Sequence, residues 1–103
     1  MKVKLTSLAS FKLTELLDYL EEEWSLSTKN KFLKKLESKV GVIKSNPDSF
    51  IISDVKKGLR RCVVTKQTTL LYKYDSETIY IITVFDNRQD LKSIEEEINK
   101  HFG

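Results

Sequence analysis

The sequence predicts a single α+β domain, in which a strand and a pair of helices precede a three-stranded antiparallel sheet and a last helix. Apolar residues alternate at period two near the N-terminus, recur at helical spacing over residues 8–45, and return to period two after Gly58. The 103 residues are 40% hydrophobic, which suffices for one core and is too little for two. With 3 Gly and 1 Pro in the chain, we expect residues 1–103 to fold throughout as one domain.

The first half of the chain is predicted to form a strand and a helix hairpin. Val3 and Leu5 alternate with polar residues, which indicates a strand over 2–6. Two apolar stripes at helical spacing then predict helices over 8–24 and 28–45. Because the connection between them is short, the helices should pack antiparallel on a common core. The residues placed in that core are Leu13, Leu16, Leu17, Leu20, Trp24, Phe32, Leu33, Leu36, Val40 and Ile43.

The second half is predicted to form an antiparallel meander and a C-terminal helix. The strands are expected over residues 59–65, 68–74 and 78–85. The last strand is apolar on both sides, which favours a central position, with strand 2–6 a candidate neighbour. Strict alternation would place Ile79, Ile81 and Thr83 on one face and Tyr80, Ile82 and Val84 on the other. Leu91, Ile94, Ile98 and Phe102 at helical spacing predict a helix over 90–101.

Positive charge is concentrated in the middle of the chain. Residues 28–66 carry eleven Lys and Arg against three acids, a net charge of +8, whereas the whole chain has a net charge of +3. Such a pole attracts polyanions or an acidic protein partner. As evidence for nucleic-acid binding alone it is weak, because solvated helices often carry this much Lys.

Several kinds of chemistry are excluded by residues that the chain lacks. A hydrolase triad needs a central histidine, and the single His101 lies near the end of the chain. A structural zinc site normally needs four Cys or His ligands, and the sequence contains only Cys62 and His101. It also contains no glycine-rich phosphate-binding loop. We therefore expect no metal and no cofactor. Apolar runs are too short for a membrane span or a signal peptide, so we expect a cytoplasmic protein.

The remaining candidate functional residues are cationic and lie at the ends of the predicted strands. They are Lys56, Lys57, Arg60, Arg61, Lys66 and Arg88. A guanidinium can form paired hydrogen bonds with a carboxylate or phosphate, and charge stabilisation of this kind is what metal-free ribonucleases require. Arg60 and Arg61 point to opposite faces of a strand, so at most one of them can belong to a given site.

The order of elements and two motifs resemble the RelE/ParE toxin superfamily. Gly58-Leu59-Arg60-Arg61 opens the sheet and Val84-Phe85-Asp86-Asn87-Arg88-Gln89 closes it, and the likeness covers about residues 1–90. The resemblance implies a toxin of a bacterial type II toxin-antitoxin pair that a cognate antitoxin holds inactive. Operator DNA would be bound only through the antitoxin.

The superfamily contains two activities, and the resemblance leaves both open. RelE-like members cut messenger RNA on the ribosome without a metal, and ParE-like members inhibit DNA gyrase. Arg88 matches the RelE-like arginine after the last strand, and Lys56 and Lys57 match its lysine pair loosely. The middle-strand arginine and the tail tyrosine of that site fall at Thr69 and Ile94. Because the RelE-like catalytic residues are incomplete, the sequence favours the hypothesis of a ParE-like toxin.

Three hypotheses follow. The first is a ParE-like toxin whose target or partner surface includes Arg60, Arg61, Lys56, Lys57, Asn87 and Gln89. The second is a ribosome-dependent endoribonuclease with Arg88, Arg61 and Lys57 as a reduced catalytic set, and the third is a degenerate member that only binds its antitoxin. In each case we expect an amphipathic acidic antitoxin segment to occupy an apolar groove between helix hairpin and sheet, with Lys and Arg at its rim.

Overall fold

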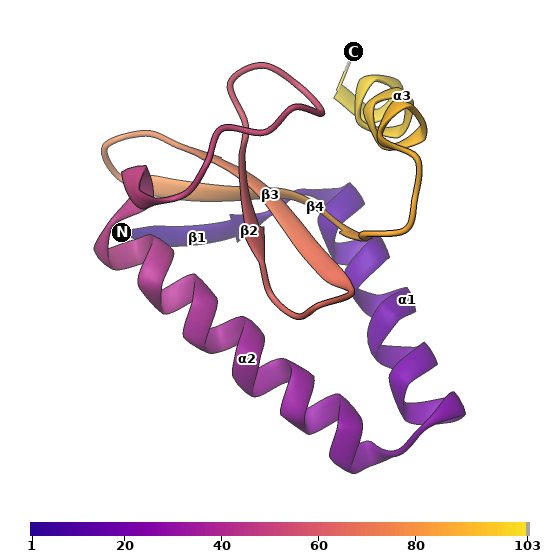
Figure 1. Ribbon diagram of the computed structural model, residues 1–103. Helices are drawn as coiled ribbons and strands as arrows, with labels where there is room; N and C mark the ends of the chain where they lie inside the picture. Colours follow the sequence, from indigo (N-terminus) through magenta and orange to yellow (C-terminus); the bar gives the residue numbers. More distant parts are fainter. Residues whose placement is uncertain (103) are drawn as a thin grey trace.

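The computed structural model describes residues 1–102 and shows three helices against a four-stranded sheet (Figure 1). The elements are β1 (Lys2–Leu5), α1 (Ser7–Glu23), α2 (Leu26–Ser45), a short 3-10 helix (Pro47–Ser49), β2 (Arg60–Val63), β3 (Thr68–Tyr74), β4 (Thr78–Asp86) and α3 (Leu91–Phe102). The predicted α+β class and element order are confirmed. In the described part of the chain, no helix is both long and apolar enough to cross a membrane.

The sheet has the strand order β1-β4-β3-β2, so β4 is central as the sequence predicts. β2, β3 and β4 form the antiparallel meander. β1 adds to β4 in parallel, which makes the whole sheet mixed. The side chain of Thr6 fixes this junction, because its Oγ1 donates to the carbonyl of Ile82 at 2.7 Å and accepts from the N–H of Ala9, where α1 begins.

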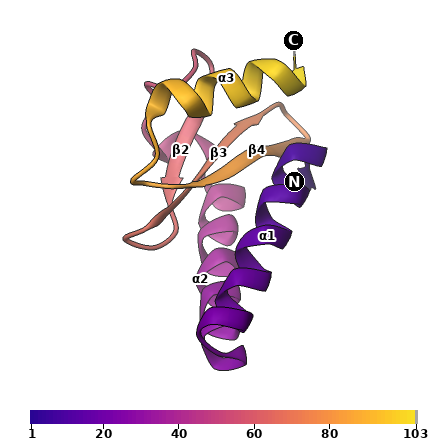
Figure 2. The ribbon, with the colours of Figure 1, turned by 90° about the vertical axis from the view of Figure 1, so that its right-hand side faces the viewer.

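The two faces of the sheet are covered by different helices (Figure 2). The α1–α2 hairpin packs on one face through a core that includes Phe32, Ile43, Leu70 and Tyr72. α3 packs on the other face, where Ile94 and Ile98 are 2% exposed. The molecule is therefore a three-layer arrangement around one sheet, and each strand presents alternate residues to the hairpin and to α3.

Two details of the predicted core are wrong. A register shift opposite Leu71 and Tyr72 adds one residue to β4, so Val84 packs with Ile81 against the hairpin instead of with Ile82. Trp24 was placed in the core and is 69% exposed. It lies directly after the last turn of α1, where the chain leaves the helix, and its position at helical spacing no longer fixes the direction of its side chain.

Candidate partner-binding groove

A groove of about 920 Å³ lies between the helix hairpin and the end of the sheet formed by the β2–β3 turn and the end of β4. Its floor is apolar and includes Leu16, Leu20, Phe32 and Val84. The other lining residues are Lys12, Tyr19, Trp24, Thr28, Lys31, Lys35, Thr65, Gln67, Thr68, Phe85, Asp86, Arg88 and Gln89. The groove therefore combines an apolar floor with a largely cationic and aromatic rim.

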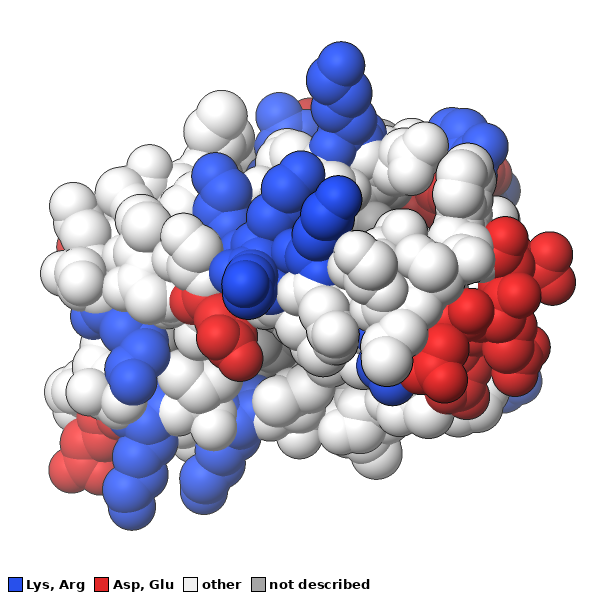
Figure 3. Space-filling view, turned by 90° about the horizontal axis from the view of Figure 1, so that it is seen from below, with Lys and Arg blue, Asp and Glu red and all other residues white. Residues whose placement is uncertain are grey.

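The charges of the hairpin are divided between its helices. α1 carries five acids and one Lys, whereas α2 carries six Lys and one Glu. Lys31 and Lys35 of α2 are exposed groove residues, and Asp86 is the one acid among the described residues that line it. Seen from below in Figure 3, one group of Lys and Arg lies in the middle of the face and others lie at the lower left, while the largest group of Asp and Glu lies at the right edge. The groove has the electrostatic character that attracts an acidic partner.

Arg88 at the end of the groove is held by Asp86. Its Nε lies 3.0 Å from Oδ1 of Asp86 and its Nη2 lies 2.7 Å from Oδ2, while its backbone N–H donates to Oδ1 at 2.8 Å. The guanidinium lowers the pKa of the Asp86 carboxyl, and the carboxylate raises the pKa of Arg88. The side chain of Arg88 is still 81% exposed, so it is oriented without being buried.

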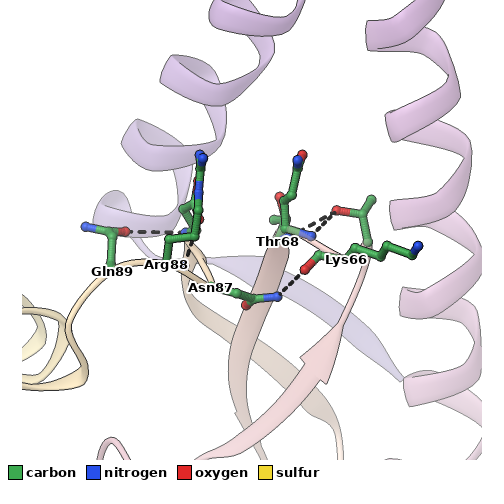
Figure 4. Close-up of polar contacts among 8 residues, drawn as sticks. Lys66, Thr68, Asn87, Arg88 and Gln89 are labelled. Atoms are coloured by element: carbon green, nitrogen blue, oxygen red, sulfur yellow. Dashed lines mark hydrogen bonds and ion pairs between the residues drawn. The ribbon is translucent and has the colours of Figure 1, made fainter.

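Asn87 joins the turn after β4 to the turn between β2 and β3. Its backbone N–H donates to the carbonyl of Gln67 at 2.8 Å, and its Nδ2 donates to the carbonyl of Lys66 at 2.8 Å. Its Oδ1 accepts from the hydroxyl of Thr69, which is 3% exposed. Figure 4 shows Asn87 reaching across to Lys66 while the side chain of Arg88 extends toward the space between the helices.

Three other cations singled out from the sequence, Lys56, Lys57 and Arg61, are not among the residues that line the groove with Arg88. Lys56 and Lys57 lie in the loop before β2, and Nζ of Lys56 donates to Oδ1 of Asn99 in α3. Arg61 is exposed and alternates with Cys62, a core residue on the hairpin side, so it faces the α3 side of the sheet. The lysine pair and Arg61 are therefore not brought together with Arg88 in the groove.

Arg60 has a structural environment of its own. Its Nη1 donates to the carbonyl of Phe50 at 2.7 Å, and its guanidinium lies 6.0 Å from the ring centre of Tyr74. Asp48 adds an ion pair at 3.8 Å. These contacts tie the segment before β2 to the sheet. They use the guanidinium of Arg60, which the sequence analysis placed on the partner surface. Of that predicted surface, Gln89 lines the groove.

Two positions relevant to ribonuclease chemistry are occupied by groups that hold the fold together. Thr69 is buried and its hydroxyl donates to Asn87, and Ile94 of α3 is 2% exposed in the core between that helix and the sheet. Cys62 is fully buried, and this burial raises the pKa of its thiol. Within residues 1–102, no three Cys, His, Asp or Glu side chains are grouped so that they could hold a metal ion.

Several groove residues escaped the sequence reasoning. Tyr19, Lys31 and Lys35 were assigned to the hairpin without a role, and Trp24 was assigned to the core. An aromatic residue on an otherwise charged helix face was the available signal for Tyr19, which is 53% exposed. Gln67 carried no signal, because only the folded sheet brings its turn beside Arg88.

Both the sequence and the fold are similar to those of known proteins. The sequence matches the family model described as the ParE toxin of the type II toxin-antitoxin system parDE over residues 3–91. No curated protein matches the chain. Similar solved structures include a chain of the chromosomal ParDE toxin-antitoxin system from P. aeruginosa, with a TM-score of 0.69 and 16% identity, covering 84% of this chain and 95% of that one.

Two further structures show the same fold. YafQ from E. coli strain BL21(DE3) has a TM-score of 0.58 and 14% identity and covers 84% of this chain and 92% of its own. A YoeB/ParE toxin from Agrobacterium tumefaciens has a TM-score of 0.59 and 14% identity, with coverages of 84% and 99%. The family match spans β1 to the first residue of α3, Leu91, and thus includes every element that forms the groove. This chain belongs to the ParE toxin family of type II toxin-antitoxin systems, and its family implies a cognate antitoxin as partner.

Proposed function

We propose that this toxin arrests growth in the ParE-like manner, by binding a large protein target such as DNA gyrase, and that it does not cut RNA. The observation that carries the proposal is the separation of the cations that a reduced ribonuclease site would need. Arg88 is paired with Asp86 at the groove, whereas Arg61 lies on the α3 side of the sheet. A charge clamp on one phosphodiester needs these groups to converge on it.

The proposal is tested with purified toxin and purified gyrase. We expect inhibition of supercoiling that the cognate antitoxin reverses, and intact message when the toxin is added to translating ribosomes. Toxin that cleaves ribosome-bound message and leaves supercoiling untouched would refute the ParE-like assignment. Normal growth on induction of the toxin alone, together with antitoxin binding in vitro, would instead identify a member that only binds its antitoxin.

A ribonuclease is the second candidate, because Arg88 is exposed at the position after the last strand where such an arginine is expected. In that case Arg88→Ala would abolish cleavage of ribosome-bound message. Arg61→Ala and Lys57→Ala would lower the cleavage rate as well. Cleavage that survives Arg88→Ala would remove the support for this candidate.

We further propose that the antitoxin neutralises the toxin by placing an amphipathic acidic segment in the groove. The apolar floor suits the buried face of such a segment, and the Lys side chains at the rim suit its acidic face. Rim charges chiefly speed up encounter, whereas buried apolar contacts slow dissociation. The association rate should therefore fall steeply with salt while the complex stays intact, and a salt-independent association rate would contradict this placement.

A further inference from the structure

The end wall of the groove is built from two turns, Thr65–Gln67 and Asp86–Gln89, that are joined by hydrogen bonds. Within the second turn, the N–H of Gln89 donates to the carbonyl of Asp86 at 2.9 Å, and the N–H of Asp86 donates to Oε1 of Gln89 at 3.3 Å. The bonds of Asn87 to Gln67 and Lys66 fix the first turn to the second. The end wall therefore has a defined shape before any partner arrives.

The hydrogen-bonding capacity of Arg88 is only partly used. A guanidinium has five N–H donors. Asp86 takes the Nε hydrogen and one Nη2 hydrogen, which leaves the outer edge, made of Nη1 and the second Nη2 hydrogen, for another acceptor. Figure 4 shows this side chain directed toward the space between the helices, and the residue lines the groove. Carboxylates and phosphates are the acceptors whose geometry matches that edge.

We propose that Asp86 and Asn87 are positioning residues, which hold the outer edge of Arg88 ready to receive one acidic side chain of the antitoxin segment. This inference rests on the proposed placement of that segment in the groove. Asp86 fixes the plane of the guanidinium, and Asn87 fixes the turn that carries it.

A protein carboxylate fits this site better than a nucleic-acid phosphate. Asp86 offsets the charge of Arg88, and affinity for nucleic acids depends mainly on net positive charge. A paired, directional hydrogen bond to a single carboxylate retains its value beside such a neutralised group. The apolar floor of Leu16, Leu20 and Phe32 next to the site also suits a peptide segment.

The two effects of Asp86 act in opposite directions on the kinetics of binding. Its negative charge weakens the attraction of an acidic partner to the groove, which slows association. Its hold on Arg88 keeps the guanidinium in the bound geometry, which slows dissociation. Asp86→Asn should therefore raise both rate constants, whereas a residue with a purely electrostatic role would change association alone.

The experiment measures association and dissociation of the full-length toxin and its cognate antitoxin by stopped-flow and surface-based binding. For Asp86→Asn we expect association to rise about twofold at low salt and dissociation to rise about tenfold. Asp90→Asn is the matched control, since it removes a nearby carboxylate that does not contact Arg88 and should leave dissociation unchanged. Arg88→Lys keeps the charge but lacks the planar fork, so we expect about tenfold faster dissociation.

The role of Asn87 in joining the two turns is tested separately. Asn87→Ala should speed up dissociation about tenfold, and thermal denaturation shows whether the variant is folded. Thr69→Val keeps the volume and removes one bond to Asn87, and it should give a smaller increase of about threefold. Dissociation that is unchanged in a folded Asn87→Ala variant would overturn the role of Asn87.

The outcomes separate this inference from the proposed groove. If Lys31→Glu and Lys35→Glu weaken binding while Asp86→Asn leaves dissociation unchanged or slower, the antitoxin occupies the groove and the positioning role is refuted. If none of these variants alters binding, the placement of the antitoxin in the groove fails as well, and with it the inference. Faster dissociation in Asp86→Asn and Arg88→Lys, with an unchanged Asp90→Asn, supports the inference.

Discussion

Removing the hydroxyl of Tyr72 should change the stability of the toxin in a way that depends on pH. Tyr72 is fully buried in the core under the hairpin, and its hydroxyl donates to the carbonyl of Pro47 at 2.6 Å. The ring of Phe50 lies edge-on at 6.2 Å. Burial raises the pKa of Tyr72 to about 12. The hydroxyl therefore anchors the 3-10 helix that follows α2 (Pro47–Ser49) to the sheet only while it keeps its proton.

Two terms set the expected effect of Tyr72→Phe. At neutral pH the variant loses one hydrogen bond and leaves a carbonyl without its partner, which should lower the free energy of unfolding by about 1–2 kcal/mol. Because the folded pKa lies above the ordinary value of about 10, the stabilisation by the neutral phenol is complete below about pH 10 and is lost as pH rises toward 12. A shift of two units corresponds to about 2.7 kcal/mol, so the wild type should lose up to that amount relative to the variant.

The assay is urea denaturation followed by far-ultraviolet circular dichroism, for both proteins, in steps from neutral to alkaline pH. Comparing the two proteins cancels the pH-dependent contributions that both share. We expect the wild type to be more stable at neutral pH, and the difference to shrink and then reverse as pH approaches 12. A constant difference across the alkaline range would refute the assigned burial of the phenol, and no difference at neutral pH would refute the bond to Pro47.

Five further substitutions test the packing, the backbone and the groove. Ile98→Ala should lower the free energy of unfolding by about 2–5 kcal/mol, whereas Leu91→Ala on the same helix, 49% exposed, should change it by less than about 1 kcal/mol in urea denaturation. Arg60→Ala should lower the free energy of unfolding by about 1–2 kcal/mol, because the bonds of Arg60 to backbone carbonyls are lost. Antitoxin affinity should stay unchanged in titration calorimetry, and weaker binding would show that Arg60 belongs to the partner surface. Gly58→Ala should cost about 1 kcal/mol or more by thermal denaturation, because φ is +88° there although the space is open, and an unchanged Tm would contradict that backbone conformation. Trp24→Ala should leave stability within about 0.5 kcal/mol but weaken antitoxin binding about tenfold, and a large loss of stability would mean that Trp24 is packed after all.

Local periodicity predicted the fold well, since each helix buries one face, while β3 and β4 are apolar and buried on both. The central place of β4 followed from its apolar residues on both sides. For the same reason the bulge in β4 was invisible: when both faces are apolar, moving Val84 from one face to the other changes nothing in the pattern. The prediction that Trp24 lies in the core was wrong for a different reason: helical spacing applies only within a helix, and Trp24 follows the last turn of α1.

The candidate site was predicted only where neighbours in sequence are neighbours in space. The turn after β4 was predicted to be functional, which stays a prediction, and its Arg88 and Gln89 line the groove. Lys56, by contrast, lies on the other side of the sheet, where its side chain contacts Asn99 of α3. Alternation separates neighbouring cations within a strand, but the position of a loop cation along the chain does not tell which face of the sheet it reaches.

The pairing of β1 with β4 has a consequence for the synthesis of the toxin. Thr6 and Ile82, which are bonded at this junction, are 76 positions apart. The helix hairpin is local and can form early, but β1 has no strand to pair with until β4 has been made. The groove also needs the turn after β4, so a nascent chain that stops before Gln89 has the hairpin without its end wall. The end wall of the groove is therefore absent until the chain has been made through Gln89, and an antitoxin that recognises the whole groove cannot bind before that point.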